Sequence, residues 1–259
     1  MAIEDLTTSL NDDQAEISDI SKTTVAIEQQ NINFEIPDFS KYVKRVSEKK
    51  CMEYVYEMVK RQENGLSIRD SNLTIRNGKI AKVAEYPHMG ALGWWTNDIP
   101  RRLSFCCGAS LISDQYLLTA AHCTSIPRDN LVQHEPNLVR LGSRYLEKSP
   151  YELPTDVEIN TVIRNPNYTS PYKDFDIALV QLTTKVQFTK FVQPACLSTF
   201  HSYEYIKKRI TATGWGSVNG DKSNMVMSRE LRYTEIHIFD TDDCDFLLDE
   251  YQYRYWHGM

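Results

Sequence analysis

The stretch that decides the fold is Leu117–Cys123, with the sequence LLTAAHC. An apolar run that leads into small residues predicts a strand whose end leaves the imidazole of His122 at the edge of a cleft. Another cysteine, Cys107, stands sixteen positions earlier. A disulfide between Cys107 and Cys123 would close a hairpin-sized loop and fix the backbone beside His122. The chain-entropy description gives such a loop about 3 kcal/mol of stabilisation.

A carboxylate at the start of an apolar strand is the natural partner for that imidazole. The segment Asp174–Leu179 reads DFDIAL, so Asp176 leads directly into buried sequence. Burying a carboxylate is costly unless a donor pairs with it. An imidazole N–H is a suitable donor, and the carboxylate would then orient the histidine tautomer and stabilise the imidazolium formed during proton transfer. In a third segment, Ala212–Gly216, glycines flank Trp215, which we expect to pack in the core.

These three segments together resemble the chymotrypsin-like (trypsin-fold) serine proteases, from about Ile75 to the end of the chain. The order of histidine before aspartate is also that of the family. The resemblance implies that His122 is the general base and Asp176 the carboxylate that orients it. The runs Pro87–Trp94 and Val46–Tyr54 are further similar to arthropod haemolymph proteases of the clip-domain type, although no six-cysteine clip module is present.

The resemblance implies an all-β fold, a chymotrypsin-like double antiparallel β-barrel. Short β-rich runs separated by turn residues predict a sandwich or barrel on their own. We place the first barrel at residues 75–185 and a partial second barrel at 186–259. In an incomplete second barrel, Leu231–Phe239 would be an unpaired edge that invites aggregation. The predicted strand runs are Cys107–Thr119, Leu138–Leu141, Val157–Ile163, Ile177–Leu182, Ile210–Thr213 and Leu231–Phe239.

Residues 1–74 are expected to be a pro-segment in two parts. Residues 1–40 hold nine acids and one base, and this composition predicts disorder, with a marginal surface helix as the alternative. Apolar residues at helical spacing predict a short helix over 41–63, with Ser40 as its N-cap.

The third member of the catalytic triad is missing from the sequence. The family places its nucleophile within Gly-Asp-Ser-Gly-Gly, and this string is absent from the 259 residues. Ser217 follows a glycine but lies too early in the chain. The oxyanion-hole donors lie beside the family's serine, so we expect this polypeptide to be C-terminally truncated and inactive. The leading hypothesis is a fragment of a serine endopeptidase zymogen. The alternatives are a non-catalytic protease homologue that binds or regulates, and an unrelated β-sandwich in which His122 and Asp176 lie far apart.

The resemblance also assigns roles to the zymogen features. Ile75 would be the N-terminus released on activation, but Thr74 precedes it where an activating protease of trypsin type needs Arg or Lys. Cys196 matches the family position that tethers the pro-segment, and Cys51 is its expected partner. Cys244 matches a position whose partner would lie beyond residue 259, and Cys106 has no assigned role.

Composition limits the partners and the compartment. The formal net charge is −6, which argues against non-specific nucleic-acid binding. No apolar run reaches the roughly 18 residues that span a bilayer, and the acidic start lacks a signal-peptide pattern. Without a phosphate loop or paired CxxC sets, we expect no cofactor and no metal. Disulfides favour an extracellular setting, and sequons mark Asn72 and Asn167 as possible glycosylation sites. The resemblance implies a protein substrate, an upstream activating protease and a serpin-type inhibitor as partners.

Overall fold

The computed structural model describes most of the chain from residue 35 onward. The predictions for residues 1–34, Asn72 and Ile75 therefore lie outside the described residues, as does Cys244. The described residues are 35–41, 45–63, 78–147, 149, 152–170, 174–199, 206, 208–217, 227–240, 242–243 and 246.

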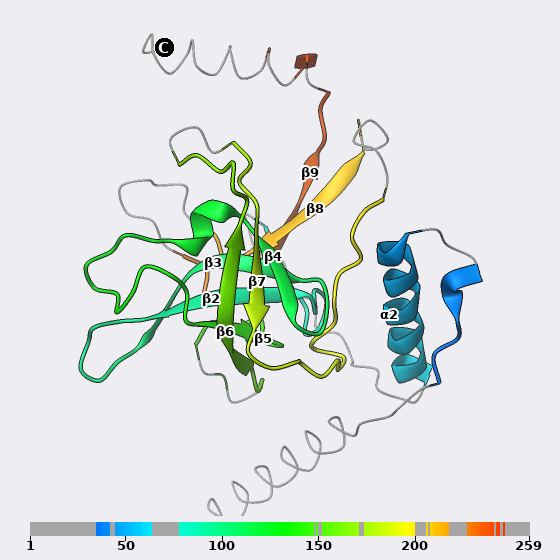
Figure 1. Ribbon diagram of the computed structural model, residues 1–259, viewed down its shortest axis with the longest axis horizontal. Coiled ribbons are helices and arrows are strands. Elements are labelled where there is room, and N and C mark those ends of the chain that lie inside the picture. Colours follow the sequence, from blue (N-terminus) through cyan, green and yellow to red (C-terminus); the bar gives the residue numbers. More distant parts are fainter. Residues whose placement is uncertain are drawn as a thin grey trace, which may run out of the picture.

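Six antiparallel strands form a closed barrel in the order β2-β3-β4-β7-β6-β5 (Figure 1). Alternating side chains of these strands point inward and fill the barrel, so the core needs no second layer. Leu92, Leu117, Val139, Val180 and Leu182 lie at this centre and are fully buried. The strands are β2 (Met89–Trp95), β3 (Leu103–Leu111), β4 (Tyr116–Thr119), β5 (Leu138–Leu141), β6 (Thr155–Arg164) and β7 (Ala178–Leu182).

A separate three-stranded sheet lies beside the barrel in the order β1-β9-β8. Its strands are β1 (Lys79–Ile80), β8 (Arg209–Gly214) and β9 (Arg232–His237). The mostly β fold, with one closed barrel and a second sheet, confirms the predicted chymotrypsin-like class. The expectation of an unpaired edge at Leu231–Phe239 is wrong at the start of β9, which lies between β1 and β8, whereas Thr234–His237 pair with β8 alone among the described residues. β1 pairs with β9 at Arg232 and Tyr233, and β8 pairs with it along its whole length.

Trp215 joins the sheet to the barrel. Its indole Nε1–H donates a hydrogen bond of 2.7 Å to the carbonyl of Arg144, which also accepts the backbone N–H of Leu231 at 2.7 Å. The Trp215 side chain is buried together with Ala81, Met89, Ala91 and Leu231. Trp215 is thus a packing residue, as the sequence indicated, and it fastens the end of β8 against the segment that follows β5 of the barrel.

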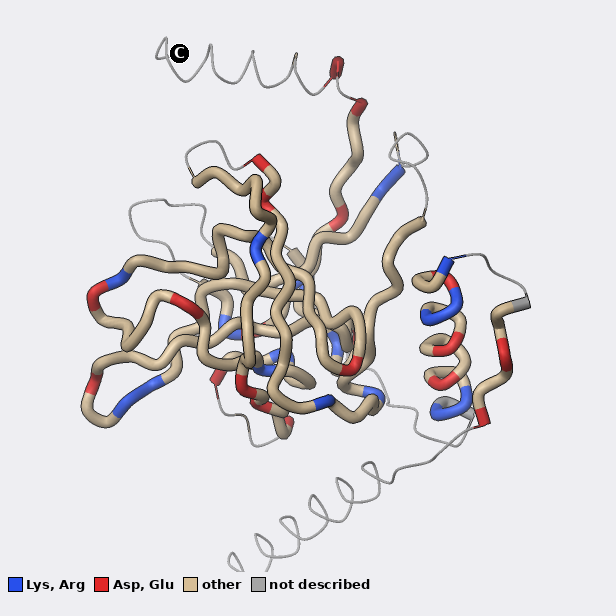
Figure 2. The backbone as a smooth tube through the Cα atoms, viewed as in Figure 1, with Lys and Arg blue, Asp and Glu red and all other residues tan. Residues whose placement is uncertain are grey.

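The helix of the N-terminal region is α2 (Val46–Glu63), which follows the short 3-10 helix η1 (Phe39–Lys41). The prediction of Ser40 as N-cap is wrong, since Ser40 lies in η1. The capping contact is made at Arg45, the residue before α2, whose backbone N–H donates to the Glu48 carboxylate at 3.2 Å. A glutamate at this third helical position satisfies an unpaired donor of the first turn. Basic and acidic residues recur along the whole of α2, as the colours in Figure 2 show.

A disulfide and one aromatic contact hold α2 against the barrel domain. The sulfur atoms of Cys51 and Cys196 are bonded, with a Cα–Cα distance of 5.0 Å. Near this bond, the rings of Tyr54 and Phe188 meet edge to face with centroids 5.4 Å apart. The disulfide is the pairing that the family resemblance implies, and it links positions 145 residues apart in the chain.

Candidate active site

The register of two neighbouring barrel strands brings the predicted histidine and aspartate together. Strands β4 and β7 pair antiparallel, and the last residue of β4, Thr119, faces the first residue of β7, Ala178. His122 follows Thr119 by three residues and Asp176 precedes Ala178 by two. Both side chains therefore belong to the same end of the same strand pair, although 54 positions separate them in sequence.

His122 and Asp176 make two hydrogen bonds. The imidazole Nδ1 lies 2.6 Å from Asp176 Oδ2, and the backbone N–H of His122 donates to Oδ1 at 2.8 Å. Because a carboxylate can only accept, Nδ1 carries the hydrogen and Nε2 is left as the basic nitrogen. Among the described residues, Nε2 has no hydrogen-bond partner. The His122 side chain is 45% exposed and that of Asp176 20%, so the pair is open to solvent on the imidazole side.

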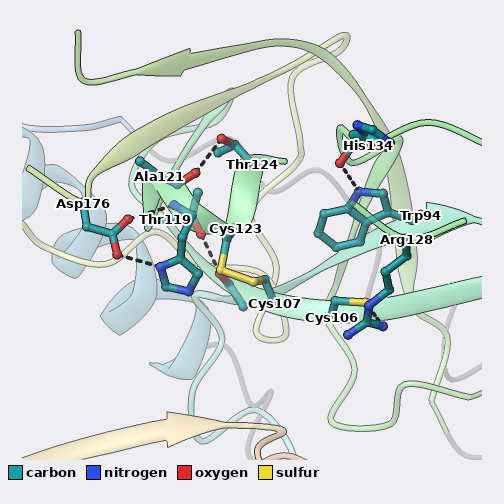
Figure 3. Close-up of a disulfide and its surroundings, with 12 residues drawn as sticks. Trp94, Cys106, Cys107, Thr119, Ala121, Cys123, Thr124, Arg128, His134 and Asp176 are labelled. Atoms are coloured by element: carbon teal, nitrogen blue, oxygen red, sulfur yellow. Dashed lines mark hydrogen bonds and ion pairs between the residues drawn. A yellow bond between two sulfur atoms is a disulfide. The ribbon is translucent and has the colours of Figure 1, made fainter. Parts of the chain in front are cut away.

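The local backbone explains why the imidazole faces outward. His122 lies in the 3-10 turn η2 (Ala121–Thr124), in which the other three residues are buried. The Cys107–Cys123 disulfide ties the next residue of this turn to β3, with a Cα–Cα distance of 5.8 Å. In Figure 3, the dashed line from Asp176 leads to an imidazole ring that lies between this carboxylate and the disulfide. The small alanines and the disulfide leave His122 as the one side chain of the turn that points away from the core.

Arg164 is a site-supporting residue that the sequence analysis missed. Its guanidinium at the end of β6 donates to the hydroxyl of Thr124 and, at 3.0 Å, to the Thr124 carbonyl. The same guanidinium pairs with Glu135 at 2.7 Å. Thr124 in turn donates to the Ala121 carbonyl at 2.7 Å, which closes the turn around His122. An arginine at a strand end gives no signal in a single sequence, so only the fold discloses this role.

The sulfur atoms of Cys107 and Cys123 and a ring nitrogen of His122 lie within 4.8 Å of one another. This cluster is not a metal centre, because the two sulfurs are bonded to each other and have no thiolate to offer. What the site holds is an imidazole that is hydrogen-bonded to a carboxylate.

The structure also describes four other residues that the sequence singled out, namely Asn167, Asp174, Cys106 and Ser217. Asn167 is exposed in a turn after β6, where a glycan would have room, and Asp174 is exposed in the loop before Asp176. Cys106 is an unpaired thiol, 3.6 Å from the hydroxyl of Ser104 and 3.3 Å from Arg128 (Figure 3). Among the described serines none makes a hydrogen bond to His122, and Ser217 is exposed beyond the end of β8, in an isolated bridge with Met227.

A closed antiparallel barrel that carries a carboxylate–imidazole pair at one end, with a second sheet alongside, defines the chymotrypsin-like serine proteases. Comparison with known families agrees, since the family "Trypsin" matches residues 75–252. This match covers well over half of the chain, and the protein therefore belongs to the trypsin family.

Arthropod proteins are among the relatives that the chain matches. "Serine protease snk" of Drosophila melanogaster is 32% identical over 198 residues, which are 72% of this chain and 44% of the relative. "Serine protease Hayan" of the same species is 31% identical over 171 residues, 66% of this chain and 25% of the relative. "Phenoloxidase-activating factor 1" of Holotrichia diomphalia is 32% identical over 154 residues, 55% of this chain and 41% of the relative. The chain thus spans less than half the length of these relatives.

In the part of the chain that the structure describes, no helix combines the length and the apolar character needed to cross a bilayer. Helix α2 is long enough for such a span but carries charges along its length.

Proposed function

We propose that this chain is part of a serine endopeptidase made as a zymogen, in which His122 is the general base and Asp176 the residue that orients it. The observation that carries the proposal is the 2.6 Å contact between His122 Nδ1 and Asp176 Oδ2. With the hydrogen held on Nδ1, Nε2 is the atom that accepts the proton of a nucleophilic hydroxyl. The Asp176 carboxylate then stabilises the imidazolium that forms, and His122 later returns the proton to the leaving amine.

The N-terminal region fits the role of a pro-segment. The Cys51–Cys196 disulfide joins α2 to the protease domain across 145 positions, so a cut anywhere between them would not release the helix. Ile75 is the proposed new N-terminus. Thr74 before it is a poor site for a protease that cuts after Arg or Lys, so activation at this bond calls for a different specificity.

The 259 residues do not include the nucleophile that the mechanism needs. Gly-Asp-Ser-Gly-Gly does not occur in them, and no described serine is bonded to His122. We therefore propose that this polypeptide by itself does not hydrolyse peptide bonds. The same observation favours a second candidate, a protease homologue that acts by binding within a protease cascade.

The compartment and the partners follow from the proposal. Two disulfides, with a sequon exposed at Asn167, support an extracellular protein. A protein substrate, an upstream activating protease and a serpin-type inhibitor are the partners that such an enzyme would meet.

The orienting role can be tested without activity. Nitrogen-15 NMR of the 259-residue chain should show His122 with its hydrogen on Nδ1, and Asp176→Ala should shift the tautomer toward Nε2–H. The His122→Ala variant assigns the signal. An unchanged His122 spectrum in Asp176→Ala would contradict the orienting role.

The catalytic proposal is tested with a fluorophosphonate, which labels activated serines. The 259-residue chain should remain unlabelled next to a trypsin control, and robust labelling would overturn our account of the nucleophile. The transcript should then be read past codon 259. An in-frame Gly-Asp-Ser-Gly-Gly supports the enzyme, and the longer chain should lose about 10⁴-fold in kcat with Asp176→Asn. A glycine in place of that serine, or a verified stop codon, supports the non-catalytic homologue.

A further inference from the structure

The connection between β2 and β3 is the most exposed loop that the structure describes around the barrel. All six residues of Asn97–Arg102 are exposed, and Ile99 has a relative exposure of 100%. The loop projects beyond the barrel at the lower left of Figure 1. Two adjacent arginines, Arg101 and Arg102, end it. Exposed loop tips of this kind are where proteases cut folded proteins.

The backbone around these arginines is weakly held. Within the described residues, the carbonyl of Arg101 accepts no hydrogen bond. The N–H of Arg102 donates only to the hydroxyl of Thr96, at 3.1 Å, and the ladder resumes at the Arg102 carbonyl, which accepts Thr96 N–H at 2.9 Å. A protease must draw an extended segment into its cleft, and the free energy of this local opening is low where few backbone bonds have to break.

Other arginines in described loops lack this freedom, since each of their carbonyls accepts a backbone N–H. Arg128 is the closest comparison, because it is also exposed and lies in the adjoining loop. Its carbonyl accepts the N–H of Leu131 at 3.2 Å, and the next carbonyl, that of Asp129, accepts from the Asn97 amide at 3.2 Å. The carbonyls of three further residues are bonded in the same way, namely Lys82, Lys208 and Arg229.

We propose that the Arg101–Arg102 bond is a processing site for a protease that cuts after arginine, and that cutting it produces a two-chain form of this protein. The reaction is hydrolysis of one amide. Water supplies the hydroxyl that joins the Arg101 carbonyl carbon, and the proton goes to the nitrogen that becomes the new N-terminus at Arg102.

The two chains stay together after the cut. Residues 1–101 contain a single cysteine, Cys51, and its disulfide partner Cys196 lies in residues 102–259. The barrel adds non-covalent contacts, because β2 stays paired with both β3 and β5. The proposal does not depend on the catalytic role of His122, since the chain is here the substrate.

The test is limited digestion of the full 259-residue chain with trypsin as the probe, followed by N-terminal sequencing. The expected product begins Arg102-Leu103-Ser104, and it migrates as the intact protein until a reductant separates residues 1–101 from 102–259. The double variant R101Q/R102Q should lose this product, with at least a tenfold lower rate, whereas R128Q should not change it. The proposal is overturned if no product begins at Arg102 before general digestion, or if the double variant is cut at an unchanged rate. Separation of the two chains without reductant would overturn the two-chain form.

A second variant tests the structural reason for the cut. Thr96→Val keeps the shape of a buried side chain but removes the hydroxyl that holds the Arg102 N–H. Loss of one such bond should speed the cut about fivefold. The Arg128 loop serves as the internal control, since its rate should stay constant. An unchanged rate at Arg101–Arg102 would show that opening of this loop does not govern the cut, and would remove the basis on which the site was chosen.

Discussion

The closed barrel and the three-stranded sheet differ in how deeply their apolar residues are buried. Strand β5 buries every side chain, β7 buries alternate side chains, and β2 is buried on both faces. In β8 and β9, the directly paired residues Ile210 and Ile236 are 38% and 43% exposed on one face of the sheet. A barrel closes on itself and needs no partner to cover its core, whereas an open sheet of three strands has one face to cover and an edge to protect. The candidate site, His122 and Asp176, lies on the closed barrel, which covers its own core.

The largest contrast should come from truncating matched aliphatic residues. Leu182→Ala in β7 leaves a cavity at a fully buried position and should lower the free energy of unfolding by about 2–5 kcal/mol. Ile210→Ala in β8 removes a side chain that solvent already reaches, and should cost less than about 1 kcal/mol. Urea denaturation measures both values. Equal losses would mean that the sheet is as well packed as the barrel, and would remove the distinction.

Glycines provide the converse experiment, because here a side chain is added. A Cβ at Gly90 in β2 would lie 2.8 Å from Val139 Cγ1 and 3.0 Å from Leu117 Cδ2, whereas one at Gly214 in β8 would meet nothing within 4 Å. Overpacking makes Gly90→Ala destabilising by about 1–3 kcal/mol. Gly214→Ala should stay within about 0.5 kcal/mol of the wild type. Thermal unfolding of both variants measures the two losses of stability. A large loss for Gly214→Ala would contradict the finding that the space beside Gly214 is open.

Gly90 also shows why one strand was absent from the sequence predictions. β2 reads MGALGWW, and two glycines in seven residues weaken any strand pattern. They stand there because side chains of neighbouring strands already fill the space that a Cβ would take, and this crowding arises only when the barrel is formed. Strands β5, β6 and β7 coincide with runs predicted from local sequence, but the single predicted run Cys107–Thr119 covers two strands, β3 and β4, with a turn between them.

The candidate site likewise has features that local sequence predicts and features that depend on the fold. His122 and Asp176 could be proposed from short motifs, because each motif sits where a strand begins or ends. That their side chains meet depends on the register of Thr119 opposite Ala178, which no local pattern contains. The support from Arg164 to Thr124 depends on the approach of β6 to the η2 turn, and the helix start depends on a cap at Arg45 that lies outside the apolar pattern.

Removing one hydrogen-bond donor can weaken the contact between the barrel and the three-stranded sheet. Trp215→Phe removes the Nε1–H bond to the Arg144 carbonyl, which keeps its bond from Leu231 N–H. The loss should be about 1 kcal/mol. Hydrogen exchange should quicken in β8 and β9 and stay unchanged in β4 and β7. Trp94→Phe is the matched control, since it removes an indole bond to the His134 carbonyl inside the barrel. If Trp215→Phe quickened exchange in the barrel as well, the two regions would unfold as one unit.

The smallest expected effect is a loss of stability at low pH, which arises at the junction where the barrel meets the three-stranded sheet. Burial lowers the pKa of His88, which precedes β2 and meets Tyr86 edge to face at 6.3 Å. Tyr86 packs on Tyr233 of β9, and burial raises the pKa of Tyr86 to about 12, so its ring stays neutral. Because the unfolded chain takes up a proton at His88 more readily than the folded one, the free energy of unfolding should fall as pH drops below about 7 toward the folded pKa.

The variant His88→Phe removes this titration and keeps an aromatic ring at the junction. The difference in melting temperature between pH 7.5 and pH 5.5 should therefore be smaller for His88→Phe than for the wild type. His134→Gln, at an exposed histidine, should leave the wild-type difference in place. Parallel pH profiles for the wild type and His88→Phe would show that the folded protein admits the proton at His88 without loss. The acid sensitivity of the junction would then have to come from another group.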